Sequence, residues 1–207
     1  NIEVEICTFS LESCLNAQLA GASRVELCSG MYDGGTTPSA AMIRMAREKL
    51  SIQLYVMIRP RGGDFLYSDL EFEMMKEDIR FAKACRADGV VLGILNADGS
   101  VDVRRTRELV ELAAPLKVTF HRAIDMTRDM EEALEGIIEA GCYRILTSGG
   151  RNTVNEGMER IKALVKQARG RVQIMAGSGV NAANASTLIK SGVDAIHLSG
   201  KSGRDSE

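Results

Sequence analysis

The sequence predicts an α/β protein of the (β/α)8 TIM-barrel class, with eight parallel strands closed into a barrel, on two observations. Eight short runs rich in β-branched residues alternate with seven longer stretches of helical periodicity, which is typical of βαβ units. The segments GASRVEL, RADGVVL, GCYRILT and GVDAIHL also align without gaps, and they fall on the second, fourth, sixth and eighth runs. Repetition on the even strands favours a closed barrel over the alternative, an open doubly wound sheet.

The first half of the chain divides into four strands and four helices. We expect strands at residues 2–7, 24–28, 52–59 and 89–94, and helices at 10–20, 38–49, 69–86 and 101–114. Gly21 follows the first helix at the usual place of a glycine C-cap. Thr37 and Pro38 predict the N-cap and first residue of the second helix. The SDLE sequence from Ser68 to Glu71 predicts a capping box for the third.

The second half continues the alternation. We expect strands at residues 117–121, 144–148, 172–176 and 194–198, and helices at 129–140, 154–169 and 182–190. Gly141 and Gly192 each stand between a helix and the next strand, as C-cap glycines do. After the last strand the chain reads SGKSGRDSE, whereas a barrel of this class normally closes with an eighth helix. The expectation is a single TIM-barrel domain over residues 1–207 whose closing C-terminal helix is missing or disordered.

Composition excludes several classes of partner. The formal net charge of −2 gives no electrostatic reason to expect nucleic acid or an anionic membrane as partner. Aromatic residues make up 4% of the chain and Trp is absent, which disfavours base stacking. No apolar run approaches the roughly 20 residues of a membrane span. The five cysteines form no CxxC pair, which argues against a zinc ribbon and favours free thiols in a reducing cytoplasm.

Strand alternation predicts which side chains point into the barrel. The outward face packs under helices and must be apolar, so the polar residues of the first, second, third, fifth and last strands point inward. The predicted lumen holds Glu5, Cys7, Glu26, Cys28, Arg59, His121 and His197. Buried carboxylates need partners, and Arg59 is the expected counter-charge. A structural ion-pair network that fills the barrel is the alternative to a functional site.

The strand ends carry side chains suited to acid–base chemistry and to anion binding. If the protein is an enzyme, the expected catalytic residues are Glu26, Arg59, His121 and His197, with the Asp125 carboxylate orienting His121. The RPRGGDF sequence and the glycine-rich loops after the late strands are typical of barrel anion sites. The expected anion-binding residues are Arg59, Arg61, Ser148, Gly149, Gly177, Gly179, Ser199 and Gly200. Ordinary turns, with an ion pair between Asp64 and an arginine, are the alternative.

Cys7 and Cys28 end the first two strands, which are neighbours in a barrel. Two sulfur ligands on neighbouring strands favour a soft metal ion, and Cu(I) matches them best. Met57 or Met175 are candidates for an additional thioether ligand. The alternative is that both cysteines are small buried hydrophobic residues.

Several motifs resemble one known family closely. ELCSG and GGTTPS within residues 26–39, VMIRPRGGDFLYSD at 56–69, VTFHRAIDM at 118–126 and RILTSGG at 144–150 are similar to those of the CutC copper homeostasis proteins. The resemblance runs nearly end to end. It implies a cytoplasmic (β/α)8 barrel, a homo-oligomer (dimer or tetramer), and a role in copper tolerance and delivery, with Cu(I) held by Cys7 and Cys28.

Three hypotheses about function follow. The first is Cu(I) binding and handling through the strand-end cysteines. The second is a TIM-barrel enzyme that acts on a small anionic metabolite, phosphorylated or not. The third is a structural or regulatory protein that binds a partner and keeps only a vestigial site. The resemblance favours the first, whereas the charged lumen favours the second, because two cysteine ligands require no arginine, histidine or glycine-rich loop around them.

Overall fold

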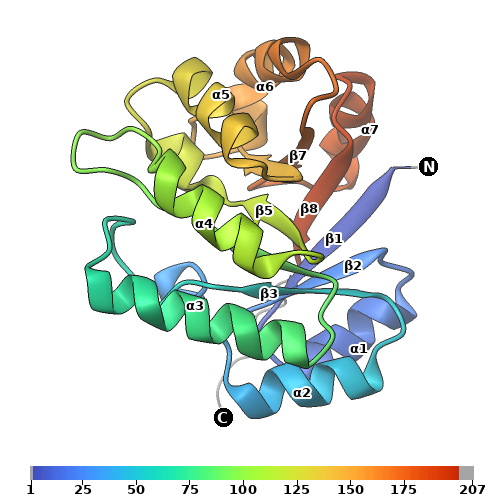
Figure 1. Cartoon of the computed structure of the whole chain (residues 1–207). Coiled ribbons are helices and arrows are strands. Elements are labelled where there is room, and N and C mark those ends of the chain that lie inside the picture. Colours follow the sequence, from blue (N-terminus) through green and yellow to red (C-terminus); the bar gives the residue numbers. More distant parts are fainter. Residues whose placement is uncertain (1, 201–207) are drawn as a thin grey trace.

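The computed structural model describes residues 2–200 and shows a closed parallel barrel (Figure 1). The strands follow one another around the barrel in chain order, and β8 pairs with β1 to close it. They are β1 (Glu3–Thr8), β2 (Arg24–Leu27), β3 (Gln53–Met57), β4 (Gly89–Leu92), β5 (Lys117–Phe120), β6 (Arg144–Thr147), β7 (Gln173–Gly177) and β8 (Ala195–Ser199). The predicted fold class is confirmed, and an open sheet is excluded.

Helices surround the barrel, one after each of the first seven strands. In the described residues they are α1 (Leu11–Leu19), α2 (Ala40–Lys49), α3 (Asp69–Ala84), α4 (Val103–Ala113), α5 (Met130–Ala140), α6 (Val154–Ala168) and α7 (Ala182–Lys190). Two short 3₁₀ turns, η1 (Met31–Asp33) and η2 (Arg122–Met126), follow β2 and β5. Within the described part of the chain, no helix is long and apolar enough to cross a membrane. The expectation of a missing closing helix concerns residues 201–207, which lie outside the described residues.

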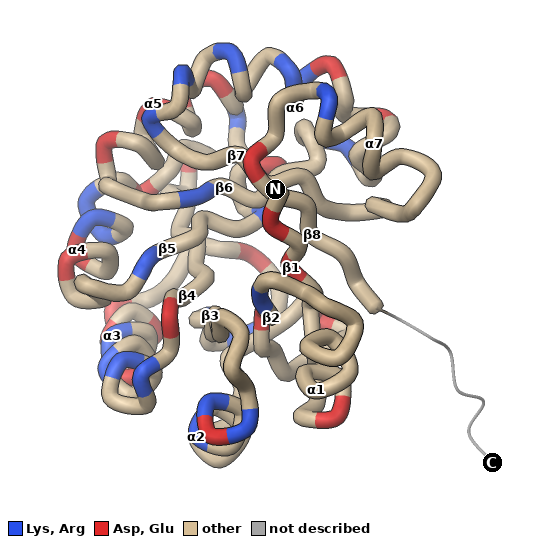
Figure 2. The backbone as a smooth tube through the Cα atoms, turned by 90° about the vertical axis from the view of Figure 1, so that its right-hand side faces the viewer, with Lys and Arg blue, Asp and Glu red and all other residues tan. Residues whose placement is uncertain are grey.

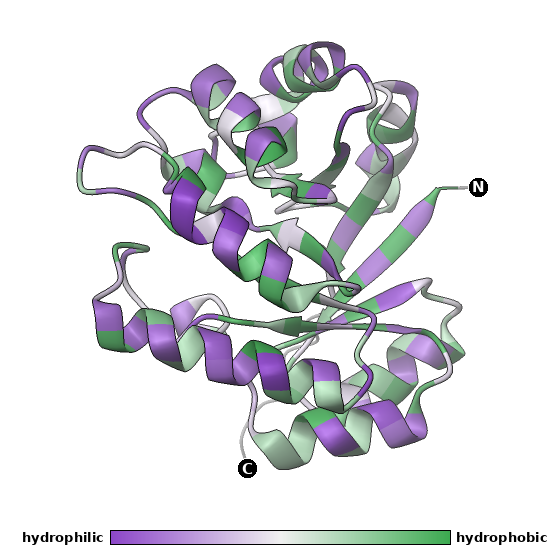
Figure 3. Ribbon diagram, in the orientation of Figure 1, coloured by the Kyte–Doolittle hydropathy of each residue, from purple (hydrophilic) through white to green (hydrophobic). Residues whose placement is uncertain are grey.

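The main hydrophobic core lies between the strands and the helices, as the alternation predicts. Val25, Leu27, Leu54 and Val56 point outward from β2 and β3 and are completely buried under helices. The helices mix apolar and polar residues along their length, as the alternating green and purple segments of α3 and α4 show (Figure 3). Outward positions therefore build the core, and inward positions are free to carry polar groups.

The helix caps agree with the sequence in part. Gly141 is the C-cap of α5, whereas Gly21 and Gly192 come one residue after the C-caps of α1 and α7. Ser68 and Glu71 form the predicted capping box at the start of α3. At α2 the N-cap is Ser39, whose side chain accepts a hydrogen bond from Met42 N, so the prediction of Thr37 and Pro38 was two residues early. The Thr37 hydroxyl instead bonds the backbone N and O of Arg59 at 2.9 and 3.1 Å. This cross-link ties the loop before α2 to the end of β3.

A charged network fills the end of the barrel where the strands begin, and we call it the barrel floor. The Arg24 and Arg144 side chains are almost completely buried, and Glu3 Oε2 accepts a hydrogen bond from each, at 2.9 and 2.8 Å. Both guanidinium groups also lie against the Tyr55 ring, 4.8 and 5.5 Å from its centroid. Figure 2 looks toward this end, with charged segments of β1 and β2 inside the ring of helices. The structural network proposed as an alternative thus exists, but it occupies only one end of the barrel.

Candidate functional site

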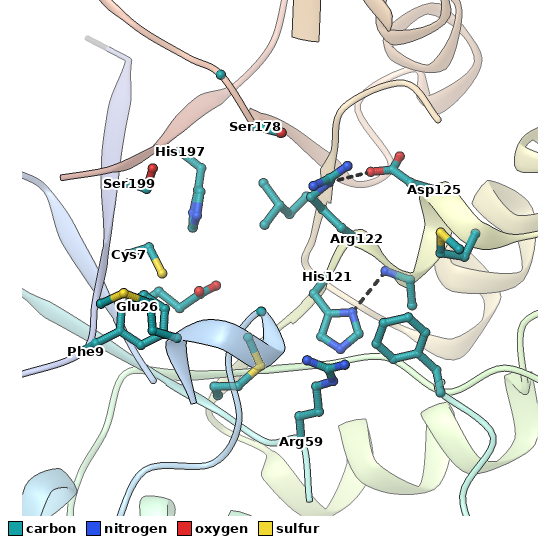
Figure 4. Close-up of a pocket in the computed structure, with 18 residues that line it drawn as sticks. Cys7, Phe9, Glu26, Arg59, His121, Arg122, Asp125, Ser178, His197 and Ser199 are labelled. Atoms are coloured by element: carbon teal, nitrogen blue, oxygen red, sulfur yellow. Dashed lines mark hydrogen bonds and ion pairs between the residues drawn. The ribbon is translucent and has the colours of Figure 1, made fainter. Parts of the chain in front are cut away.

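A pocket of about 430 Å³ opens at the opposite end of the barrel, where the strands terminate. It brings together predicted site residues that are far apart in the sequence, which are Cys7, Glu26, Arg59, His121 and His197. Figure 4 shows Cys7, Glu26 and His197 on one side, and Arg59 with His121 on another. The carboxyl ends of barrel strands are where TIM-barrel sites are built, so the pocket is in the expected place.

Glu5 lies just below the pocket and connects it to the barrel floor. Its side chain is completely buried, accepts a hydrogen bond from Arg24 Nε, and bonds His197 Nδ1 at 2.7 Å. Burial alone would raise the pKa of Glu5, but His197 and Arg24 outweigh it and lower the pKa to about 2. Burial opposes a charge on His197, yet Glu26, Cys7 and Glu5 together raise its pKa well above the usual value. The imidazole is therefore held as a cation in a fixed orientation.

The positive charge that neutralises Glu5 comes from Arg24 and not from Arg59, which was the predicted counter-charge. Arg24 was missed, although the same alternation that placed Glu26 and Cys28 inward places it inward too. Arg59 lies beyond the end of β3 and donates to the backbone oxygens of Asp33, Gly35 and Gly63, so it does not neutralise the lumen carboxylates.

The sulfur of Cys7 lies beside three groups able to share a proton or a metal. Ligand atoms of Cys7, Glu26 and His197 all lie within 4.8 Å of one another. The Cys28 thiol donates to Glu26 Oε1 at 3.3 Å. The neighbouring Cys28 thiol, helped by His197 and opposed by burial, lowers the pKa of Cys7 to about 5. The Cys7 sulfur and burial raise the pKa of Cys28, and burial followed by the charge of Cys7 raises that of Glu26. The cluster thus favours a thiolate on Cys7.

The two candidate thioether ligands lie in different places. Met57 packs with Cys28 on the pocket side of the barrel, and Gly35 lies against both side chains. Met175 is buried and its sulfur contacts Arg24 Nη2 at 3.6 Å, toward the barrel floor. Of the two methionines, only Met57 is near the cysteines.

His121 is held by its own backbone rather than by a carboxylate. Its Nδ1 accepts a hydrogen bond from Ala123 N at 3.1 Å, whereas Asp125, expected to orient it, binds other groups. Its ring lies 5.0 Å from the Phe65 ring. Burial and the positive charge of Arg59 lower the pKa of His121 to about 3, so the ring is neutral.

The glycine-rich loop after β6 already holds an anion, which is the Asp125 carboxylate. Ser148 N and Gly150 N donate to it at 3.1 and 3.0 Å, Thr147 Oγ1 at 2.6 Å, and Arg122 Nε at 2.8 Å. The amide of Ser148, predicted to receive an external anion, is thus bonded internally. A carboxylate from η2 thus takes up backbone donors of this loop that were expected to bind an external anion.

Arg61 is also bound internally. It pairs with Asp64 at 3.1 Å and with Glu71 at 2.7 Å, and it lies over the Tyr67 ring. The ion pair between Asp64 and an arginine, weighed as the alternative for this loop, therefore forms. Arg61 does not line the pocket that holds Arg59.

The remaining predicted loop residues have different surroundings. Gly179 and Ser199 line it. Gly177 packs so closely that an added Cβ would lie 3.2 Å from His197 Cβ, and Gly200 lies near Ile6. Gly149 serves packing against α6, since an added Cβ would come within 2.3 Å of a backbone oxygen there.

Ser178 lines the pocket in a left-handed backbone conformation, with a φ of 84°. A serine in this region is strained, and such strain is concentrated at functional sites. Ser178 was not predicted as a site residue, although it lies between the predicted residues Gly177 and Gly179.

Comparisons with known proteins agree with the resemblance seen in the sequence. The model of the CutC family matches residues 2–202. A CutC family protein from Chromobacterium violaceum is 51% identical over 96% of this chain and 81% of its own length. The copper homeostasis protein cutC homolog of Mus musculus is 48% identical over 98% of this chain and 75% of its own. The crystal structure of CutC from Streptococcus agalactiae superposes with a TM-score of 0.90 at 38% identity, covering 95% and 98% of the two chains.

Proposed function

Because the chain belongs to the CutC family, some of whose members are named copper homeostasis proteins, we propose that it binds and handles Cu(I) through Cys7 and Cys28. The ion is cargo in this proposal, and the protein holds it for transfer.

The observation that carries the proposal is the convergence of soft and polar donors at one end of the barrel. The Cys7 sulfur lies within 4.8 Å of a Glu26 carboxylate oxygen and a His197 ring nitrogen, and the Cys28 thiol hydrogen-bonds Glu26 in the same cluster. Thiolate sulfur selects Cu(I) over the harder divalent ions, so two cysteines in such a cluster fit this ion best. Glu26 Oε2 is buried without a partner among the described residues, which leaves it free to interact with a bound ion or its ligands.

The surrounding residues prepare the cysteines for a metal. Thiols must lose their protons to bind a metal, and the lowered pKa of Cys7 makes the first loss easy. Cys28 keeps its proton until the ion arrives, because its pKa is raised. The acceptor of its hydrogen bond is Glu26 Oε1, 3.3 Å from the sulfur. Glu5 fixes His197 beside this pair. Binding of Cu(I) is therefore expected to displace the one remaining proton, that of Cys28.

The setting of the site supports two further parts of the proposal. All five cysteines are free thiols, which suits a reducing cytoplasm. The family resemblance supports a homo-oligomer, a dimer or a tetramer, of a single barrel domain.

An anaerobic Cu(I) titration against a competing chelator tests the proposal. The wild type is compared with the double variant Cys7→Ser, Cys28→Ser, and with Cys85→Ser, which removes a thiol at the end of α3. We expect the wild type and Cys85→Ser to bind about one Cu(I) per chain, because both keep the two thiol ligands. We expect the double variant to lose this binding. Equal affinity in all three proteins would refute the assignment of Cys7 and Cys28.

A further inference from the structure

Two buried nitrogen atoms in residues that line the pocket lack hydrogen-bond partners among residues 2–200. They are Nε of Arg59 and Nε2 of His121, in side chains of residues only 6% and 5% exposed. A buried polar group without a partner costs free energy, so each calls for a partner from outside the chain.

Both atoms are hydrogen-bond donors. His121 Nδ1 accepts from Ala123 N, so the proton of this neutral ring is on Nε2. The other nitrogens of the Arg59 guanidinium already donate to backbone oxygens of the loops around the pocket. Figure 4 shows the His121 ring turned toward Arg59. Two donors on neighbouring side chains, both without an acceptor, can be satisfied by the oxygen atoms of one ligand.

The charge of Arg59 also lacks a partner among the described residues. Arg24, Arg61, Arg122 and Arg144 each form an ion pair with an acidic side chain, but Arg59 forms none in the described residues. Its neighbours are neutral backbone oxygens and the Tyr67 hydroxyl. One uncompensated cation matches one negative charge. A phosphate dianion would bring more charge and more acceptors than these two donors satisfy, and the loop after β6 is filled by Asp125.

The pocket wall near this pair is apolar. The Phe65 ring lies 5.0 Å from both the His121 ring and the Arg59 guanidinium carbon. Met31, Met57, Met126 and Leu146 also line the pocket. A volume of about 430 Å³ falls within the range of small-molecule sites. The ligand therefore has an organic, partly apolar body.

We propose that the pocket binds a small organic monocarboxylate, whose carboxylate accepts hydrogen bonds from Arg59 Nε and His121 Nε2 and whose body lies along Phe65. This site shares the pocket with the cysteine cluster but uses different residues, and it does not rest on the copper proposal.

Calorimetric titration of the metal-free full chain with phenylacetate, butyrate, phenylacetamide and inorganic phosphate tests the proposal. The variants are His121→Asn and Arg59→Lys, with Arg107→Lys on the outer surface as control. Asparagine keeps an acceptor for Ala123 N while removing the Nε2 donor, so His121→Asn tests the site even if Arg59→Lys fails to fold. Because no copper is present, the outcome is independent of the Cu(I) titration.

We expect at least one carboxylate to bind the wild type and the control equally, and to bind His121→Asn at least about tenfold more weakly. The amide and phosphate are expected to bind more weakly than the carboxylates. The proposal is overturned if neither carboxylate binds, if phenylacetamide or phosphate binds as tightly as phenylacetate, or if His121→Asn leaves the affinity unchanged.

Discussion

Replacing Glu5 with glutamine removes the charge that joins the pocket to the barrel floor. The Glu5 carboxylate is completely buried and bonds both Arg24 and His197. Removing one partner of a buried ion pair typically costs about 3–5 kcal/mol, because the remaining charge stays buried. The pKa of Glu5 gives an independent figure, since a fall from 4.5 to about 2 corresponds to roughly 3 kcal/mol. We therefore expect Glu5→Gln to lower the free energy of unfolding by about 3 kcal/mol at neutral pH.

The same reasoning predicts how this loss depends on pH. A carboxyl whose pKa is lowered on folding stabilises the protein fully above its unfolded pKa, and this stabilisation disappears as the pH falls through the folded pKa. For Glu5 the window runs from 4.5 down to about 2. The difference between the wild type and Glu5→Gln should thus be largest near pH 6 and fall to roughly half or less near pH 3.

Urea unfolding followed by far-ultraviolet circular dichroism measures both effects, because the chain has no Trp to report by fluorescence. Glu135→Gln is the matched control. The pKa of Glu135 is also lowered to about 2, by Arg171 first, but this carboxylate lies on the surface, where solvent screens its ion pair. We expect the control to lose far less stability. A Glu5→Gln protein as stable as the control, or a difference that does not shrink in acid, would refute the reasoning.

Two further predictions concern the residues around the pocket. Asp125→Ala should lower the free energy of unfolding by about 3 kcal/mol and free the amides of Ser148 and Gly150. Inorganic phosphate should therefore raise the melting temperature of the variant but not that of the wild type. An equal response in both proteins would contradict the internal role of Asp125. Gly93→Ala should lower the free energy of unfolding, measured with urea, by about 1–3 kcal/mol, because the new Cβ would lie 2.5 Å from His121 Cε1. A variant as stable as the wild type would contradict the tight packing of the His121 ring.

The barrel and the residues of its lumen could be predicted because both depend on periodic patterns. Alternation along β1 and β2 placed Glu5, Cys7, Glu26 and Cys28 inward, and the structure has them there. The same alternation places Arg24, two residues before Glu26, inside the barrel, so its inward position could also have been predicted from the sequence.

The contacts made by loops could not be predicted in this way. Arg59 lies beyond Met57, the last residue of β3, so alternation no longer decides what it touches. Its acceptors are backbone oxygens of two loops, which no residue type reveals. Asp125 likewise reaches the loop after β6 only because η2 turns its carboxylate across the strand ends. These contacts depend on the path of the backbone in three dimensions.

The two bonds of Glu5 also bear on any attempt to transplant this site into another barrel. A designer who copied only Cys7, Cys28, Glu26 and His197 would move the cysteine cluster and leave behind the anchor of the imidazole. Glu5 holds His197 from below, Arg24 neutralises Glu5, and Glu3 holds Arg24 in place. The smallest portable unit is thus a column of side chains running from the barrel floor to the pocket, and a graft without its lower half would leave the histidine free to rotate.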